Sequence, residues 1–350
     1  MSLLPRDGRR VRIAIVKLSS LGDVIHALPL ASALRRTYPA AHLTWIVEAR
    51  EYALLRDHPD LDAVLPVDTR LWRRLIQRPA GAHLVWQKVA RLQARIRASW
   101  FDVTVDVQGL IKTGVLTAYT GAPLRIGFSP SWCREWPNAL FTNRHVTPPA
   151  EAEHVVEQYL ALLGPLSVAP AAPEFHIPVR AEADRRMEEF LGEQGIKPHD
   201  TLVALNPGAS RQNKRWPAAH MRALAERLGA EPGVRLLLLW GPDEIHMARE
   251  IKNQLSMKAI LAPPTDLAEL TALLRRVALL VANDTGPLHL AAALGTPSLG
   301  LYGPTPARRN RPYGPHGRGL QSPDGTMIGL DPDVVFDASV ALLAELGVGP

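Results

Sequence analysis

Short apolar runs alternate with helical patterns along the whole 350-residue chain. Most of these runs are almost continuously apolar, which is typical of parallel strands that helices cover on both faces. The alternation therefore predicts an α/β fold. The expected strands are 11–16, 43–48, 63–67 and 101–107 in the first half of the chain, and 201–206, 234–240, 259–262, 278–283 and 298–303 in the second half.

A proline-rich stretch, 164–179, separates the two halves and has no helical period. It is the best candidate for a linker between domains. We therefore predict two Rossmann-like, doubly wound domains facing a cleft, residues 1–170 and 171–350. Ligands of such sheets bind beyond the carboxyl ends of the strands, so the residues after positions 16, 206, 240 and 283 are the candidates for a site.

The final helix is predicted from a cap and an apolar stripe. Asp331 can cap it and Pro332 suits its first position. The stripe is expected to make ordinary core contact, and the alternative is that the helix packs back onto the first domain. Its members are Val334, Val335, Ala338, Leu342 and Leu346.

Composition limits the classes of function. The net charge of +6 and the sequence pI of about 9.7 favour anionic partners, although a general bias toward arginine explains them equally well. A single cysteine, Cys133, excludes a disulfide framework and favours a reducing compartment. No apolar run approaches the roughly 20 residues that span a bilayer, and the basic N-terminus lacks the apolar core of a signal peptide.

The loop 206–217 follows a predicted strand and precedes a helix expected to start near Pro217. Gly208, the hydroxyl of Ser210 and the ammonium of Lys214 are suited to binding phosphate oxygens. The alternative is a basic surface loop.

Two further loops carry carboxylates after strands. In 283–297, Asp284 is followed by Thr285, Gly286 and a proline at a helix start, so backbone N–H groups can bind a diphosphate while Asp284 caps the helix or binds sugar hydroxyls. His289 lies in the first turn, where a histidine is more often a packed or surface residue. In 241–244, Glu244 suits a ribose diol, or simply a helix N-terminus.

The stretch 17–30, KLSSLGDVIHALPL, follows the first strand and holds Asp23 at a helix start. Aspartate is a favoured helix cap, but Pro29 lies too deep in this helix to be without cost. Broken local rules are common at functional sites. Asp23 is therefore a candidate general base that takes a proton from an acceptor hydroxyl.

Other cofactor and nucleophile motifs are absent from the sequence. It contains no G-x-G-x-x-G after the first strand, no P-loop, no H-E-x-x-H and no G-x-S-x-G. No cluster of two histidines and a carboxylate suggests a metal site.

Taken together, these segments resemble the lipopolysaccharide heptosyltransferases, ADP-heptose enzymes of glycosyltransferase family 9, most closely the heptosyltransferase I group, which adds the first heptose to Kdo-lipid A. The resemblance covers nearly the whole chain. It rests on VKLSSLGDVIHALP, DVQGLIKTG, CREW…LFTNR, NKRWP, WGPDE and NDTGPLHLAAALGTP…LYGPT.

The resemblance implies a two-domain GT-B fold and an inverting, metal-free transfer from ADP-L-glycero-β-D-manno-heptose, with no further cofactor. Asp23 matches the proposed general base, and Lys17, Ser19 and Ser20 match the loop beside it on the acceptor side. The implied donor site comprises Ser210, Lys214, Glu244, Asp284, Thr285, Gly286 and His289. The loop that holds Glu244 is one residue shorter than in the family. Arg134, Glu135 and His154 lie in family-like stretches with no assigned role.

The resemblance also implies an acceptor of the inner membrane's cytoplasmic face, and hence a cytoplasmic protein at the membrane periphery that binds no nucleic acid. Segment 70–100 fits an anionic interface, because basic residues there alternate with Trp72, Leu75, Trp86 and Leu92. A solvated pair of amphipathic helices is the alternative. The basic residues singled out for acceptor binding are Arg73, Arg74 and Arg78.

Three other interpretations stay open on the sequence. A heptosyltransferase II-like or related transferase would keep the chemistry and change the acceptor. A non-catalytic binder of nucleotide sugars would need Lys214 and Asp284 but not Asp23. A nucleic-acid protein would account for the charge, but the sequence holds no known binding module.

Overall fold

The computed structural model describes residues 10–78, 81–345 and 347. By its internal contacts the chain divides into two compact units, residues 1–178 and 179–350. The division falls inside the proline-rich stretch 164–179, which has one 3₁₀ turn, η2 (Gly164–Leu166), and no regular structure from 167 to 180.

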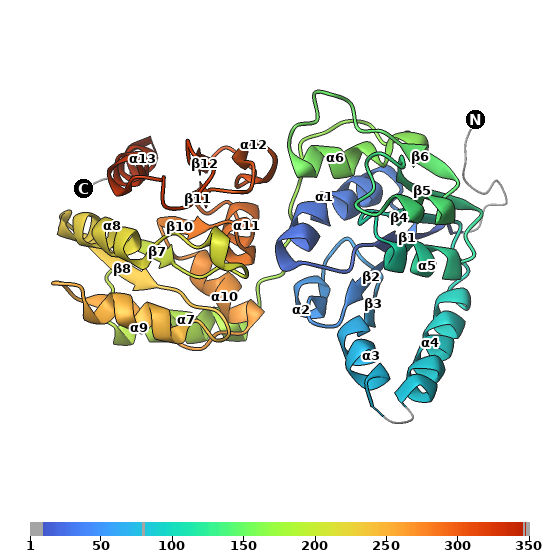
Figure 1. The fold of residues 1–350 in the computed structure, drawn as a ribbon, viewed down its shortest axis with the longest axis horizontal. Helices are drawn as coiled ribbons and strands as arrows, with labels where there is room; N and C mark the ends of the chain where they lie inside the picture. The colour runs from blue at the N-terminus through green and yellow to red at the C-terminus, as the bar shows by residue number, and fades with distance from the viewer. Residues whose placement is uncertain (1–9, 79–80, 346, 348–350) are drawn as a thin grey trace. The chain divides into compact units, whose positions relative to one another are not determined.

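The first unit is a six-stranded parallel sheet with the order β3-β2-β1-β4-β5-β6. Its strands are β1 (Arg12–Val16), β2 (His42–Glu48), β3 (Ala63–Val67), β4 (Val103–Asp106), β5 (Leu124–Phe128) and β6 (Arg144–Val146). Its helices are α1 (Leu21–Thr37), α2 (Tyr52–Leu55), α3 (Thr69–Ile76), α4 (Gly81–Arg97), α5 (Ile111–Tyr119), the 3₁₀ helix η1 (Trp136–Phe141) and α6 (Val155–Ala161). Helices α3 and α4 extend away from this sheet as a pair (Figure 1).

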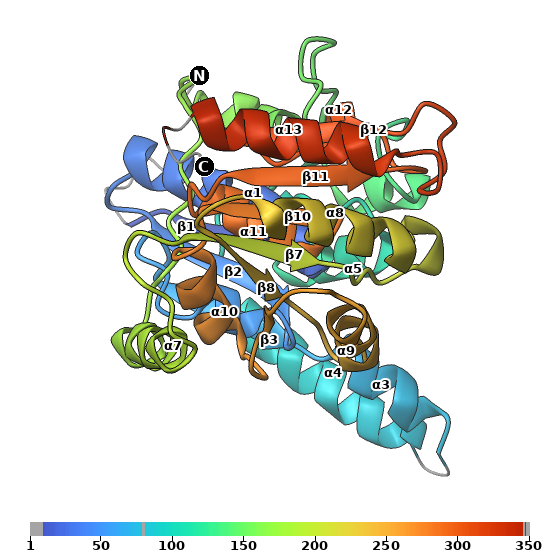
Figure 2. The ribbon, with the colours of Figure 1, turned by 90° about the vertical axis from the view of Figure 1, so that its left-hand side faces the viewer.

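The second unit is also a six-stranded parallel sheet, with the order β12-β11-β10-β7-β8-β9. Its strands are β7 (Thr201–Asn206), β8 (Val234–Leu238), β9 (Ala259–Leu261), β10 (Leu279–Asn283), β11 (Ser298–Tyr302) and β12 (Gly317–Gln321). Its helices are α7 (Ala181–Glu193), η3 (Gln212–Lys214), α8 (Ala218–Ala230), α9 (Ile245–Asn253), α10 (Leu267–Leu274), α11 (Gly286–Ala293), α12 (Ala307–Asn310) and α13 (Pro332–Glu345). Helices flank this sheet, with α8 beside α9 and α13, and α7 beside α10 (Figure 2).

Both sheets follow the same winding. When the strands of the second unit are counted from β7, its order becomes 3-2-1-4-5-6, which is also the order of the first unit and that of Rossmann folds. The chain order reverses between β1 and β4 in one sheet and between β7 and β10 in the other. These two switch points are where such folds bind ligands. All nine expected strands exist, within a few residues of their predicted bounds, and the α/β prediction is confirmed.

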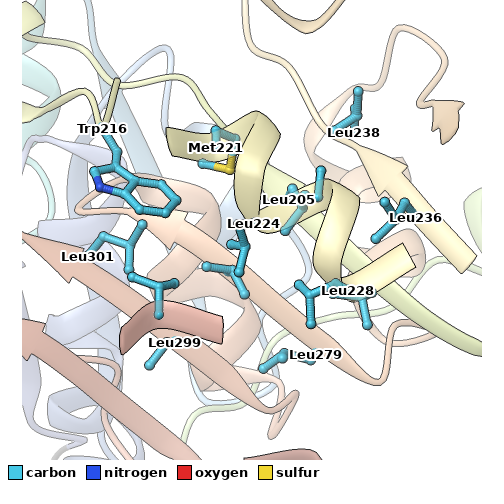
Figure 3. Packing of buried hydrophobic residues seen from close by; sticks show 14 of the residues in the cluster. Leu205, Trp216, Met221, Leu224, Leu228, Leu236, Leu238, Leu279, Leu299 and Leu301 are labelled. Carbon is cyan, nitrogen blue, oxygen red and sulfur yellow. The ribbon is translucent and has the colours of Figure 1, made fainter. Parts of the chain in front are cut away.

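The core of the second unit determines where one candidate loop lies. Met221, Leu224 and Leu228 recur along one side of α8 and pack onto leucines of the sheet (Figure 3). Trp216, just before the same helix, is fully buried in this cluster, and its indole N–H donates to the carbonyl of Leu330 at 2.9 Å. Burying a tryptophan removes a large apolar area from water, so Trp216 anchors the loop that carries Lys214.

Helix α13 belongs to that same core. Asp331 Oδ1 accepts a hydrogen bond from the Asp333 N–H at 2.8 Å, which confirms the predicted cap. Val335, Leu342 and Leu343 are buried in the cluster and the helix packs on α8. Val334 is exposed and was wrongly included in the stripe, and Leu346 lies outside the described residues.

Candidate functional site

Asp23 lies in the first turn of α1, just beyond the carboxyl end of β1. One carboxylate oxygen, Oδ2, accepts hydrogen bonds from the backbone N–H of Ser20 at 3.1 Å and from its hydroxyl at 2.8 Å. Ser20 is the N-cap residue, so Asp23 completes a capping arrangement from the third helical position. The capping alternative is therefore correct for this oxygen.

The other oxygen, Oδ1, has different partners. The hydroxyl of Tyr159 on α6 donates to it at 3.3 Å, and the ammonium of Lys17 lies 3.8 Å away. Lys17 also donates to the Tyr159 oxygen at 2.8 Å, and its side chain is only 1% exposed. A carboxylate oxygen has room for two hydrogen bonds, and the Asp23 side chain is 29% exposed. Among the described residues Oδ1 receives one hydrogen bond and Oδ2 two, so Oδ1 is the oxygen better placed to take a proton.

The charge environment keeps Asp23 ionised. Burial raises the pKa of this carboxyl, but the Lys17 charge, the hydrogen bonds from Ser20 and the charge of Arg134 outweigh it and hold the pKa below its ordinary value. A base with a lowered pKa is weak, so its contribution depends on how well it is positioned.

A buried polar network fixes the loop that leads to Asp23. The Oε1 atom of Gln108 accepts the N–H of Leu18 at 2.7 Å. Asp106, the last residue of β4, in turn accepts the N–H of Gln108 at 2.9 Å and the side-chain amide of Asn138 at 2.7 Å. Asp106 is fully buried, and burial raises its pKa. The sequence did not predict a function for Asp106, Gln108, Asn138 or Tyr159. The motif DVQGLIKTG contains Asp106 and Gln108 but does not indicate their role.

In the second unit, Lys214, Asp284 and His289 form one cluster. The Lys214 ammonium lies 2.6 Å from Asp284 Oδ2, and His289 Nε2 lies 3.2 Å from Asp284 Oδ1. Asp284 follows β10, Thr285 is the N-cap residue of α11 and Gly286 its first residue. His289 is buried, as expected for a packed histidine, but it also bonds to a candidate site residue.

The cluster lowers the pKa of Asp284 strongly. Burial alone would raise the pKa of this carboxyl, which is 11% exposed, but the hydrogen bonds and charges of His289 and Lys214 bring it to about 2. Asp284 is therefore an anion at neutral pH. Lys214 has three N–H donors and Asp284 uses one, which leaves donors for phosphate oxygens.

Two buried asparagines bind backbone groups at both ends of the loop that carries Lys214. The side-chain amide of Asn283 donates to the carbonyls of Pro207 and Gly208, and its oxygen accepts the N–H of Trp216 at 3.0 Å. The Oδ1 atom of Asn206, at the end of β7, accepts the Gly208 N–H at 3.2 Å. No sequence signal distinguished these asparagines from ordinary strand ends, although they fix the loop between Gly208 and Lys214.

Glu244 is the N-cap residue of α9, and its Oε2 accepts the Gly241 N–H at 3.0 Å. Its carboxylate lies against Gly208, where an added Cβ would come within 1.9 Å of Oε2. Gly208 is thus needed for a close approach between the loops after β7 and β8. Ser210 is exposed in the same β7–α8 loop.

The basic residues Arg73, Arg74 and Arg78 are exposed at the end of α3 and just beyond it. Segment 70–100 carries eight basic residues and no acidic one, and its residues 79–80 lie outside the described structure. Trp72 and Leu92 pack against the core of the first unit, whereas Trp86 is exposed. Both helices are therefore amphipathic, and their outer surface is strongly cationic.

The three residues without an assigned role have structural contacts. Glu135 accepts the Ile111 N–H at 2.7 Å and donates its own N–H to the Gly109 carbonyl. His154 is the N-cap residue of α6. Arg134 is exposed and acts on Asp23 through its charge.

In the described ranges, no helix is long and apolar enough to cross a bilayer. Over those same residues, no group of three or more His, Cys, Asp or Glu side chains is arranged to hold a metal ion.

Comparison with known proteins places these features in context. Residues 89–330 match the model of glycosyltransferase family 9 (heptosyltransferase). The lipopolysaccharide heptosyltransferase 1 of Pseudomonas aeruginosa is 33% identical, over 84% of this chain and 79% of the relative. That of Salmonella typhimurium is 31% identical, over 93% of this chain and 99% of the relative.

Solved structures agree with these relatives. A family 9 glycosyltransferase from Veillonella parvula has a TM-score of 0.83 at 25% identity and covers 99% of both chains. The E. coli heptosyltransferase WaaC with ADP has a TM-score of 0.78 at 25% identity, covering 94% of this chain and 98% of that one.

Proposed function

The chain belongs to glycosyltransferase family 9, and we propose that it transfers L-glycero-D-manno-heptose from ADP-heptose to the Kdo of Kdo-lipid A, in the inner core of lipopolysaccharide. The single observation that carries the assignment of the site is the pair of carboxylates at the two switch points: Asp23 beside Lys17, and Asp284 beside Lys214. The first suits proton transfer and the second suits donor binding.

The donor is bound by the second unit. Lys214 and the N-terminus of α11, at Thr285 and Gly286, supply positive charge for the diphosphate. Asp284 accepts hydrogen bonds from the heptose hydroxyls while His289 keeps it oriented. Glu244 accepts hydrogen bonds from the ribose hydroxyls, and the exposed Ser210 contacts a phosphate oxygen.

The transfer is a single displacement. The acceptor hydroxyl attacks the anomeric carbon of heptose, Asp23 Oδ1 takes the hydroxyl proton, and the bond from that carbon to the ADP oxygen breaks with its electron pair on ADP. The configuration at the anomeric carbon inverts. Lys214 and the α11 N-terminus stabilise the departing diphosphate, so the reaction proceeds without a metal or further cofactor. Added EDTA should leave the rate unchanged.

The acceptor binds to the first unit. Lys17, Ser19 and Ser20 form the loop beside the base, and Arg73, Arg74 and Arg78 attract the phosphates and carboxylates of the glycolipid. The protein thereby works at the cytoplasmic face of the inner membrane as a peripheral protein. Replacing all three arginines by glutamine should raise the KM for Kdo-lipid A about tenfold or more, while the affinity for ADP, measured by calorimetry, stays the same.

The test is transfer by the purified protein from ADP-heptose to Kdo-lipid A, followed by mass spectrometry. The proposal predicts the addition of one heptose. If ADP-heptose binds but no transfer occurs, an already heptosylated acceptor is tried next. Transfer to that acceptor alone would assign a heptosyltransferase II-like activity, and no transfer to either would favour a non-catalytic binder.

A further inference from the structure

Large apolar side chains are exposed on neighbouring elements of the first unit. Ile111 begins α5, Trp132 lies in the turn after β5, and Trp136 and Leu140 lie on η1. Trp136 is 63% and Leu140 74% exposed. Because apolar side chains gathered on an exposed face mark interaction sites, this set, the α5–η1 patch, needs a partner.

The members of the patch lie on elements that contact one another. Helix α5 packs directly against η1, and an added Cβ at Gly114 of α5 would meet Phe141 of η1 at 2.5 Å. The turn that bears Trp132 is closed by its N–H to the Ser129 carbonyl at 2.9 Å. Glu135 joins the two sides, since it binds the Ile111 N–H. The patch is therefore a built surface and not a set of scattered residues.

Charge indicates what covers this surface. Residues 111–144 contain four basic residues, Lys112, Arg125, Arg134 and Arg144, and one acidic residue, Glu135, a formal charge of +3. A second copy of the chain would place these like charges against each other. An anionic lipid bilayer suits both the basic and the apolar side chains of the patch. Basic side chains attract its headgroups, and tryptophan side chains insert at the headgroup level.

The position of the patch relative to the base supports this partner. Arg134 lies between Trp132 and Trp136 in the chain and is close enough for its charge to lower the pKa of Asp23. The strongly basic α4 also contacts α5. A bilayer bound here would therefore meet the protein beside both the candidate base and the cationic segment.

We infer that the α5–η1 patch inserts into the surface of an anionic bilayer, and that it is a membrane anchor distinct from the basic α3–α4 segment. This rests on the proposed function only in supposing a lipid-borne acceptor. The anchor positions the protein so that a sugar rising from the bilayer reaches Asp23 while its acyl chains stay in the membrane.

The test is flotation of the full chain with vesicles of phosphatidylethanolamine and phosphatidylglycerol at a ratio of three to one. Trp136→Ser should lower the partition coefficient about tenfold, and adding Trp132→Ser and Leu140→Ser should lower it further. Because the lost contact is apolar, the difference from wild type should persist at high salt, where attraction by the basic helices is screened.

The matched control is Ile328→Ser. Ile328 is 69% exposed but lies in the second unit, between β12 and α13, and belongs neither to the patch nor to the basic segment. This variant should float like wild type. Unchanged melting temperature and ADP affinity in all variants would exclude misfolding.

Two results would overturn the inference. One is equal flotation of wild type and the triple variant, or no flotation of wild type at all. The other is a wild-type dimer that the triple variant abolishes while its vesicle binding is unchanged, which would assign the patch to self-association. Flotation needs no transfer, so a failure of the proposed activity would leave this result readable on its own.

Discussion

Asp23 and Asp284 lie at the switch points of the two sheets, Asp23 after the first strand of its sheet and Asp284 after the fourth, and they are held in different ways. Asp23 is the third residue of α1, whereas Asp284 directly precedes the N-cap residue of α11. Each has a lysine nearby: Lys17 directly follows β1, and Lys214 comes from the loop after β7. Lys214 forms a close ion pair with Asp284 at 2.6 Å, whereas Lys17 stays 3.8 Å from Asp23, with the Tyr159 hydroxyl bonded to both. Asp284 is thus held by an ammonium on one oxygen and an imidazole on the other, whereas among the described residues Asp23 Oδ1 accepts one hydrogen bond, from the Tyr159 hydroxyl.

The difference suits each carboxylate to the role proposed for it. A carboxylate that binds a substrate hydroxyl should stay ionised and fixed, and Asp284, with a pKa of about 2, satisfies this. A base must accept a proton during the reaction, so a tight ion pair on the accepting oxygen would oppose it. Holding the Lys17 ammonium on Tyr159 keeps the charge near Asp23 without blocking that oxygen.

The largest effect is expected from Asp23→Asn. The amide keeps the shape and an acceptor oxygen for Ser20 but cannot take a proton, so turnover should fall about 10²- to 10⁴-fold. Asp68→Asn is the matched control, because Asp68 Oδ1 caps α3 through the Leu71 N–H and has no place in the site. Equal turnover in both variants would show that Asp23 caps α1 and is not the base.

Lys214→Ala should weaken donor binding at the Asp284 cluster. It removes a charged donor from the diphosphate and leaves Asp284 without its ion pair, so the affinity for ADP should fall about 10- to 100-fold by calorimetry. Lys258→Ala is the control, since Lys258 precedes β9 at the amino edge of the same sheet. Unchanged affinity in Lys214→Ala would remove this lysine from the phosphate site.

Tyr159→Phe tests what keeps the Lys17 ammonium 3.8 Å from Asp23 Oδ1. Without the hydroxyl, the buried Lys17 ammonium loses an acceptor and moves onto Asp23 Oδ1, so kcat should fall about tenfold with ADP affinity unchanged. In a Lys17→Met background the same substitution should change kcat much less, because no ammonium remains to move. A similar loss in both backgrounds would show that the Tyr159 hydroxyl acts on Asp23 directly and not through Lys17. Tyr119→Phe controls for the loss of a hydroxyl elsewhere in this unit.

The smallest effect concerns stability and pH. The folded-state pKa of Asp284 lies below the unfolded value of about 3.9, so its ionisation stabilises the fold above that value, and this contribution is lost as the pH falls toward about 2. Between pH 5 and pH 3 the free energy of unfolding should fall by about 1 kcal/mol more in wild type than in Asp284→Asn. Urea titrations of both proteins, with the exposed Asp337→Asn as control, measure this; parallel pH curves would contradict the coupling.

Much of this architecture could be predicted because parallel strands are long apolar runs. The three strands that were missed, β5, β6 and β12, are short or carry polar and glycine residues, as in RHV and GRGLQ. They lie at or near one edge of each sheet, where less of each strand must be apolar. The shared strand order of the two sheets could not be predicted from the sequence either, since strand order depends on contacts between distant segments.

The candidate site residues that could be predicted are those in segments that follow a strand. Asp23, Lys214 and Asp284 lie in the segments that follow β1, β7 and β10. The structure brings Lys214, Asp284 and His289 into contact. Tyr159 was not predictable, because it is 136 residues from Asp23 and lies on an ordinary amphipathic helix. Gln108, Asn206 and Asn283 act by hydrogen bonds to backbone groups, which a sequence pattern does not reveal.

The most direct test of the division between the two carboxylates is a paired measurement on Asp23→Asn and Asp284→Asn: ADP-heptose affinity by calorimetry, and the single-turnover rate of heptose transfer at saturating donor and acceptor. The account predicts that Asp23→Asn binds the donor like wild type and transfers at least about 100-fold more slowly. It predicts that Asp284→Asn loses donor affinity. Normal transfer by Asp23→Asn, or weakened donor binding in that variant with normal binding in Asp284→Asn, would contradict it.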